Sequence, residues 1–130
     1  MNAVSEDIKD MLIDESTLGL GFTTNLFIGN EPISPDNCVT LYDTPSFPAE
    51  TTLDRQRIYN SSFQVRVRNN SYPLGMTLAR NIMDYLHARA QETWNGTLYT
   101  VIEASGEPAM MAWDGNKRAI IILNFNVKRR

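Results

Sequence analysis

The sequence predicts an α+β protein with a mostly antiparallel β-sheet of about five strands and two helices packed against it. Three observations support this prediction. Two segments repeat apolar residues at helical spacing, one segment alternates apolar and polar residues strictly, and helices and strands do not alternate regularly along the chain. Regular alternation is typical of a doubly wound parallel sheet, so its absence favours the α+β class. We expect one domain, residues 1–130, because 130 residues is an ordinary domain length.

The helical segments are predicted at residues 4–15 and 71–91. The apolar face of the first consists of Val4, Ile8, Met11 and Leu12. The second segment begins with Ser71, a good N-cap, and Pro73 falls in the first turn, where a missing N–H costs nothing. Its apolar face is predicted to consist of Leu74, Leu78, Ile82, Tyr85 and Leu86. Both helices are expected to pack across the sheet.

The clearest strand is residues 63–68, Phe-Gln-Val-Arg-Val-Arg, where apolar and polar side chains occupy opposite faces. Asp114-Gly115-Asn116 predicts a hairpin turn, because Asp-Gly favours positive φ. The last strand begins as a continuous apolar run and then alternates, which is typical of a central strand buried on both faces at one end. Shorter apolar runs predict the remaining strands, at 26–29, 39–43, 98–104 and 109–113, with the last strand at 119–127.

Residues 44–57 form a long polar segment without useful periodicity, and Phe47 lies near its start. A loop of this length inside a compact domain is uncommon and is often functional. One interpretation is an arm that reaches across an oligomer. A plain flexible loop is equally compatible with the composition.

The composition argues against several classes of protein. A net charge of −3 and a pI of about 5.1 are unlike a dedicated nucleic-acid binder, which usually has a basic stripe. The N-terminal segment has no basic and apolar regions of a signal peptide. No apolar run approaches the roughly 20 residues that a membrane span needs. We therefore expect a soluble protein with no membrane partner that starts in the cytoplasm.

Residues that could carry catalysis are few. His87 is the only histidine, and we interpret it as a surface residue. Cys38 is the only cysteine, and we interpret it as a small buried side chain. A Cys–His pair stays formally open, but no motif supports it. Asp114-Gly115-Asn116 superficially resembles a calcium loop, yet the other oxygen ligands are absent and turn chemistry explains it better. The sequence thus predicts no catalytic residue, no cofactor, no metal and no enzymatic activity.

Candidate interface residues lie in the 44–57 segment and in the strand that follows. Arg66 and Arg68 share one strand face. A solvated sheet face explains these arginines as well as contact with acidic groups of a neighbouring subunit, where the guanidinium suits carboxylates. The candidate set is Phe47, Asp54, Arg55, Arg57, Arg66 and Arg68.

The order and spacing of these segments resemble the tail-terminator, or minor capsid, family of long-tailed bacteriophages. The resemblance covers nearly the whole chain, although each motif is weak individually. The basic C-terminus, Lys128-Arg129-Arg130, has no place in the family pattern. The segments that carry the resemblance are the acidic N-terminal helix, Leu41-Tyr42-Asp43, Pro45 with the irregular arm, the 63–68 strand, the 71–91 helix, and Asp114 to Arg118 before the last strand.

The resemblance implies a structural virion protein that forms a hexameric ring. Such a ring caps the tail tube, terminates its polymerisation and provides the docking surface for head–tail joining. The implied partners are further copies of the chain, the major tail tube protein and a head-completion or neck protein. Double-stranded DNA is expected to pass through without specific binding, which suits an acidic protein. The implied location is the tail or neck of the virion, after assembly in the host cytoplasm.

Two other interpretations stay open at this point. The first is another neck component, such as a stopper, or a tail-tube protein. The second is a small cytosolic enzyme or binding module, against which stands the lack of a catalytic constellation.

Overall fold

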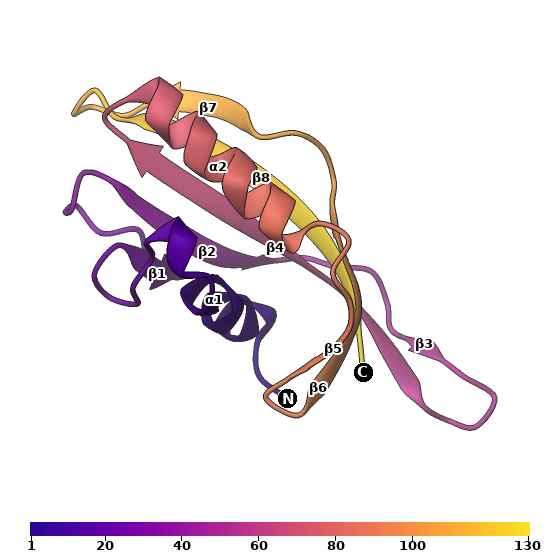
Figure 1. Ribbon diagram of the computed structural model, residues 1–130. Coiled ribbons are helices and arrows are strands. Elements are labelled where there is room, and N and C mark those ends of the chain that lie inside the picture. The colour runs from indigo at the N-terminus through magenta and orange to yellow at the C-terminus, as the bar shows by residue number, and fades with distance from the viewer.

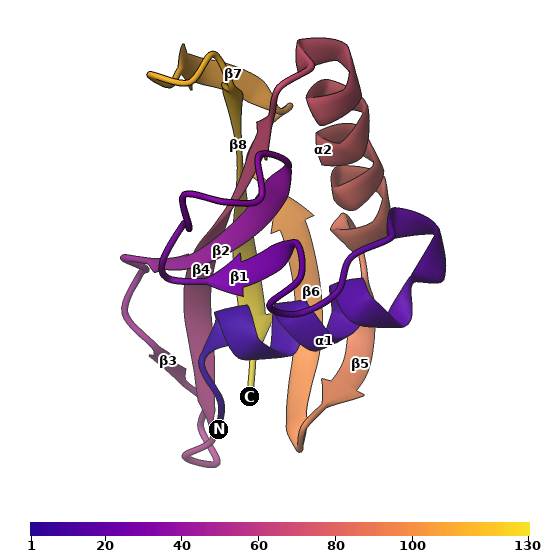
Figure 2. The same ribbon diagram turned by 90° about the vertical axis from the view of Figure 1, so that its left-hand side faces the viewer.

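The computed structural model describes residues 1–130 and has one curved, mixed β-sheet with both helices on the same face (Figures 1 and 2). The predicted α+β class is confirmed, with eight strands in place of about five. The strands follow the main order β1-β2-β4-β8-β6-β5, while β3 pairs with β4 and β7 pairs with β8. The helices are α1 (Val4–Asp14) and α2 (Tyr72–Leu86), with a short 3₁₀ helix, η1 (Ser16–Leu18), between α1 and the first strand.

Two long antiparallel strands, β4 (Arg57–Asn69) and β8 (Ala119–Arg129), form the middle of the sheet. They pair from Tyr59 opposite Arg129 to Asn69 opposite Ala119. This paired stretch is about 33 Å long at the usual rise per strand residue. β8 is therefore the central strand that its sequence pattern predicts.

Shorter strands complete the sheet on both sides of this pair. β2 (Cys38–Thr44) lies antiparallel to β4, and β1 (Leu26–Ile28) lies parallel to β2. On the other side, β7 (Ala109–Trp113) and β6 (Thr97–Ala104) pair with successive parts of β8, and β5 (Ala90–Trp94) pairs with β6. The two-residue strand β3 (Glu50–Thr51) pairs with the first residues of β4.

The core lies between the helices and the inner face of the sheet. The predicted face of β4 is confirmed, since Phe63, Val65 and Val67 are fully buried. The rings of Phe63 and Phe125 stack with their centres 4.8 Å apart. The predicted apolar face of α1 is also buried. One continuous hydrophobic core therefore joins both helices to the central strands.

The N-terminus of α1 is capped by a residue far away in the sequence. The helix starts after Ala3, which has no side-chain acceptor for the free backbone N–H groups. Asp43 at the end of β2 replaces it: its carboxylate accepts hydrogen bonds from the Ser5 backbone N–H at 3.0 Å and from the Ser5 hydroxyl at 2.7 Å. This contact fixes the start of α1 against the end of β2.

Helix α2 is shorter than predicted and differs in its buried face. It ends at Leu86, and its buried residues are Gly75, Ala79, Ile82 and Leu86. Leu74 is 64% exposed, so its predicted place in the core is wrong. Gly75 is the buried residue of this turn instead. A Cβ atom at this position would lie 3.0 Å from side-chain atoms of both Asn69 and Ile121. The helix can approach the sheet closely only through this glycine.

The segment after α2 contains an unpredicted strand. Ala88 and Gln91 adopt positive φ, which directs the chain out of the helix and into β5. Asn95 and Gly96, both with positive φ, connect β5 to β6 in a tight turn. The hairpin predicted at residues 114–116 is present, but the residue with positive φ is Lys117 rather than Gly115.

A buried polar network joins both ends of the chain. Asp7 of α1 is fully buried and accepts hydrogen bonds from the Tyr99 hydroxyl and, at 2.7 Å, from the Asn95 amide. Arg129 is also buried, with Nη1 3.9 Å from the Asp7 carboxylate and 2.8 Å from the Asn2 carbonyl oxygen. The basic C-terminus, which the family pattern does not explain, thus has a structural role at Arg129.

Candidate subunit interface

The segment predicted as an arm is an ordered β-hairpin that projects from one end of the sheet (Figure 1). Glu50 and Thr51 of β3 pair with Ile58 and Arg57 of β4. Asn60 holds the base of the hairpin through a 3.1 Å hydrogen bond from its side-chain amide to the Pro48 carbonyl oxygen. We call residues 45–57 the arm. It differs from a plain flexible loop because these pairings give it a defined shape.

The tip of the arm is closed by local hydrogen bonds around Thr52. The Thr52 backbone N–H donates to the Gln56 carbonyl oxygen at 2.8 Å, and the Thr52 hydroxyl donates to the Asp54 carboxylate. That hydroxyl lowers the pKa of Asp54. Arg55 takes a positive φ of 67°, which lets the chain reverse within the turn. Leu53, at the outermost point of this turn, is fully exposed.

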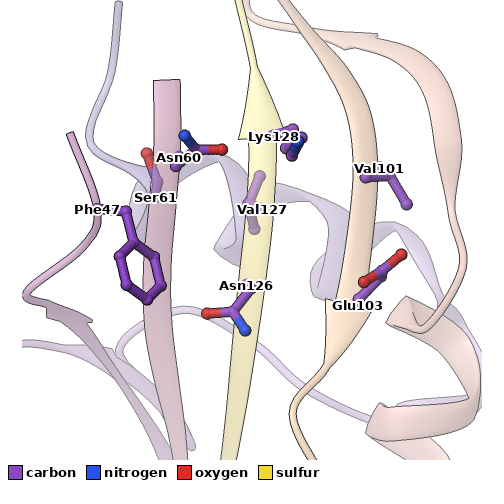
Figure 3. Close-up of a pocket in the computed structure, with 8 residues that line it drawn as sticks. All are labelled: Phe47, Asn60, Ser61, Val101, Glu103, Asn126, Val127 and Lys128. Carbon is purple, nitrogen blue, oxygen red and sulfur yellow. The ribbon is translucent and has the colours of Figure 1, made fainter. Parts of the chain in front are cut away.

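Phe47 lies at the base of the arm beside a shallow hollow of about 190 Å³ (Figure 3). The figure shows its ring next to β4, with Val101 and Glu103 of β6 beyond β8. Phe47 is 71% exposed, so the hollow covers it only partly. An exposed phenylalanine beside such a hollow is a common feature of contact surfaces between proteins.

The arm and the C-terminus bring several basic residues together. Arg55 and Arg57 are exposed and form no ion pair in the chain. Arg130 donates a 3.1 Å hydrogen bond to the Gln56 side chain, and Lys128 lies 4.0 Å from Glu50. Four of the predicted interface residues, Phe47, Asp54, Arg55 and Arg57, thus lie in the arm, next to the basic C-terminal residues.

The other two predicted residues lie away from the arm. Arg66 and Arg68 both pair with Glu31, at 3.1 Å and 3.4 Å, under the 29–37 loop that folds over the outer face of the sheet. Arg68 is only 4% exposed and also donates to the Pro35 carbonyl oxygen at 2.7 Å. Contact of either arginine with a neighbouring subunit stays a prediction, and Arg68 has little surface left for it.

A second exposed surface lies at the opposite end of the β4–β8 pair. All five residues of β7, Ala-Met-Met-Ala-Trp, are exposed, and β7 has a partner strand on one side only. Apolar edge strands without charged residues are uncommon, because their free N–H and C=O groups attract other strands. The two ends of the molecule thus present different surfaces.

The residue types that often serve in catalysis or metal binding make contacts here that belong to the fold. Cys38 is buried on β2, and this burial raises the pKa of its thiol. His87 accepts a 3.0 Å hydrogen bond from the Ala104 backbone N–H through Nδ1. No group of three or more His, Cys, Asp or Glu side chains is arranged to hold a metal ion. No helix is both long and apolar enough to cross a membrane.

Sequence reasoning missed Leu53, Glu31 and the exposure of β7. Leu53 is the only large apolar residue between two polar stretches of the arm, and that isolation was a usable signal. Glu31 gave none, because its partners Arg66 and Arg68 lie on a distant strand. The exposure of β7 was missed because its large side chains, Met110, Met111 and Trp113, are apolar like those of a buried strand.

The comparisons with known proteins agree with this fold. A family model described as bacteriophage tail terminator protein matches residues 4–129. A chain from the virion of a native gene transfer agent particle is similar in structure, with a TM-score of 0.63 at 13% identity, over 98% of this chain and 94% of that chain. A second solved structure matches with a TM-score of 0.53 at 17% identity, over 96% of this chain and 90% of the other.

A search of curated proteins gave no match. The family match nevertheless spans almost the entire sequence and includes both helices, the arm and the central strands. The chain belongs to the bacteriophage tail terminator protein family, and its role is structural, in the phage tail.

Proposed function

We propose that this protein forms a ring, hexameric in its complete form, that caps the tail tube and stops its polymerisation. The observation that carries the proposal is the match to the tail terminator family over residues 4–129. In the proposed virion the ring also provides the docking surface for a head-completion or neck protein. Its subunits assemble in the host cytoplasm, and the ring contacts the major tail tube protein at one end.

The different surfaces of the molecule are compatible with a ring that also contacts other virion proteins. A cyclic ring is built from heterologous contacts, so each subunit presents two different surfaces to its neighbours. The arm is a projecting hairpin with exposed apolar and basic side chains. The apolar strand β7 lies at the far end of β8 and is a suitable contact for a different virion protein. The molecule thus has separate surfaces for separate partners.

The chemistry of the outer face of the sheet is compatible with a surface past which DNA moves without binding. Its exposed middle consists of neutral polar side chains that bond to one another, with Ser62 donating to Asn126 at 3.0 Å and Gln64 donating to Asn124 at 3.1 Å. Glu31 offsets the charges of Arg66 and Arg68 on the same face. Phosphate binding depends mainly on free Lys and Arg side chains, and this region has few.

The test is a phage in which this gene is silenced by an early stop codon. Electron microscopy should show tails of uncontrolled length that are not joined to heads, and the wild-type gene supplied from a plasmid should restore both features. Tails of normal length in the silenced phage would refute the terminator function. Tails of normal length that fail to join heads would instead support a stopper or another neck component.

A shortened arm tests whether the arm holds the ring together. Replacing residues 48–57 with a short glycine turn should leave the fold intact, because this hairpin adds nothing to the buried core. Circular dichroism checks the fold, and native mass spectrometry with and without tail tubes measures assembly. Loss of rings with an unchanged fold is the expected result, and rings that survive the replacement would exclude an arm that clasps its neighbour.

A further inference from the structure

A second hollow, of about 400 Å³, lies where the end of α1 and η1 meet the C-terminal half of α2. Leu18 and Tyr85 are half-buried and give it an apolar floor. Tyr85 is held in place, because its hydroxyl donates a 2.9 Å hydrogen bond to the Met11 carbonyl oxygen. We call this the α1–α2 hollow. Its lining residues are Glu15, Thr17, Leu18, Asn81, Asp84 and Tyr85.

The charge at the rim of the α1–α2 hollow is negative. Asp84 and Glu15 lie in its lining, and Asp14 directly precedes Glu15 at the end of α1. None of the three carboxylates forms an ion pair within the chain. The hollow therefore combines an apolar floor with uncompensated negative charge.

The tip of the arm has the opposite shape and the opposite charge. Leu53 projects fully exposed from a closed turn, and the exposed Arg55 and Arg57 beside it have no ion-pair partner in the chain. The tip thus combines one exposed apolar side chain with two guanidinium groups, and the carboxylate of Asp54 between them in sequence bonds to the Thr52 hydroxyl. This combination matches a small apolar floor beside carboxylates. Guanidinium groups pair with carboxylates through directed, charge-assisted hydrogen bonds.

The arm and the α1–α2 hollow lie on opposite sides of the molecule. In Figure 2 the arm extends to the left of the sheet, whereas the end of α1 and the lower end of α2 lie to the right. The arm is also paired to β4 and tied by Asn60, so it does not fold back across its own subunit. Two complementary surfaces on opposite sides of one chain meet only between copies.

We propose that the tip of the arm of one subunit docks in the α1–α2 hollow of the next copy in the ring. Leu53 packs against Leu18 and Tyr85, while Arg55 and Arg57 pair with the carboxylates around Asp84. This assignment rests on the proposed ring and specifies which surfaces make it.

Charge reversal tests the contact in both directions. Arg55→Glu with Arg57→Glu reverses the arm, and Asp14→Arg with Asp84→Arg reverses the hollow; all four side chains are exposed, so the fold should persist. Each double variant alone should associate on the order of 100-fold more weakly, because like charges then face each other. Lys117→Glu is the control, because this exposed lysine lies at the far end of β8.

Mixing the two reversed variants in equal amounts gives the decisive result. The reversed arm then fits the reversed hollow, and the native arm of the second variant fits the native hollow of the first, so rings of alternating subunits should form. Native mass spectrometry with variants of different mass detects the alternation. A mixture that stays monomeric, or single variants that assemble like wild type, would overturn the proposed contact.

The outcomes separate this contact from the proposed ring. Rings that persist in the reversed-arm variant refute the contact and leave the ring intact. Wild-type subunits that associate into open filaments, and lose that association on charge reversal, support the contact and refute the closed ring. Wild-type protein that stays monomeric alone and on tail tubes refutes both.

Discussion

Replacing Asp7 with alanine should be among the most destabilising single changes in this protein. Asp7 is fully buried, and its carboxylate receives the Tyr99 hydroxyl, the Asn95 amide and the charge of Arg129. Without it, Arg129 keeps only neutral oxygen partners, at Asn2 and Tyr99. A buried positive charge without its counter-charge is the costly result of this substitution.

The expected size of the effect follows from that unpaired charge. Breaking a buried ion pair from one side costs about 3–5 kcal/mol. For a domain of this length, 1 kcal/mol corresponds to about 4 °C in Tm, so the loss should be about 12–20 °C. Asp7→Asn keeps the size of the side chain and should lose less, about 1–3 kcal/mol.

Urea unfolding followed by circular dichroism, together with thermal melts, measures these differences. Asp14→Ala serves as the control, because Asp14 is exposed on the same helix and should change stability by under ~0.5 kcal/mol. In the double variant Asp7→Ala with Arg129→Met, part of the loss should return, because no charge is then buried alone. The reasoning is refuted if Asp7→Ala costs under about 1 kcal/mol, or if the two single losses simply add.

Three further predictions concern other parts of the fold. Burial, followed by the hydrogen bond to Asp7, raises the pKa of Tyr99 above its usual 10.0, so the folded state holds this proton more tightly than the unfolded state. The resulting stability is complete below pH 10 and falls as the pH rises beyond it, and Tyr99→Phe should flatten this alkaline decline by up to about 1.4 kcal/mol per pH unit in urea titrations. Glu31→Gln should cost about 1–3 kcal/mol by the same assay, since Arg66 and Arg68 lose their only carboxylate; an unchanged midpoint would show that the backbone carbonyls suffice. Gly75→Ala should destabilise rather than give the ~1 kcal/mol gain usual in a helix, because the new methyl group would lie 3.0 Å from Asn69 and Ile121; a higher Tm would show that these neighbours yield.

The parts of the fold that were predictable are those governed by a simple period. The alternation at residues 63–68 and the helical spacing from Val4 to Leu12 each fix one buried face, and both faces are buried in the structure. The pattern of the last strand likewise predicted its central place. In these segments burial alone decides the local conformation.

Segments whose conformation depends on distant partners were not predictable. The polar sequence Ala90–Trp94 has no strand pattern and becomes β5 only through β6. Arg68 lies on the polar face of its strand yet is buried, because the 29–37 loop supplies Glu31 and three carbonyl oxygens. The arm was located correctly, but its hairpin shape follows from backbone pairing that its composition does not reveal.

The place of β8 at the centre of the sheet has a consequence for synthesis of the protein. This strand joins β4 to β6 and β7, yet it follows all of them in the sequence, and its Arg129 completes the network around Asp7 of the first helix. While the ribosome still covers these residues, the earlier strands lack the partner that joins them. The sheet is therefore completed only after β8 has emerged, and chains truncated before β8 should aggregate instead of assembling.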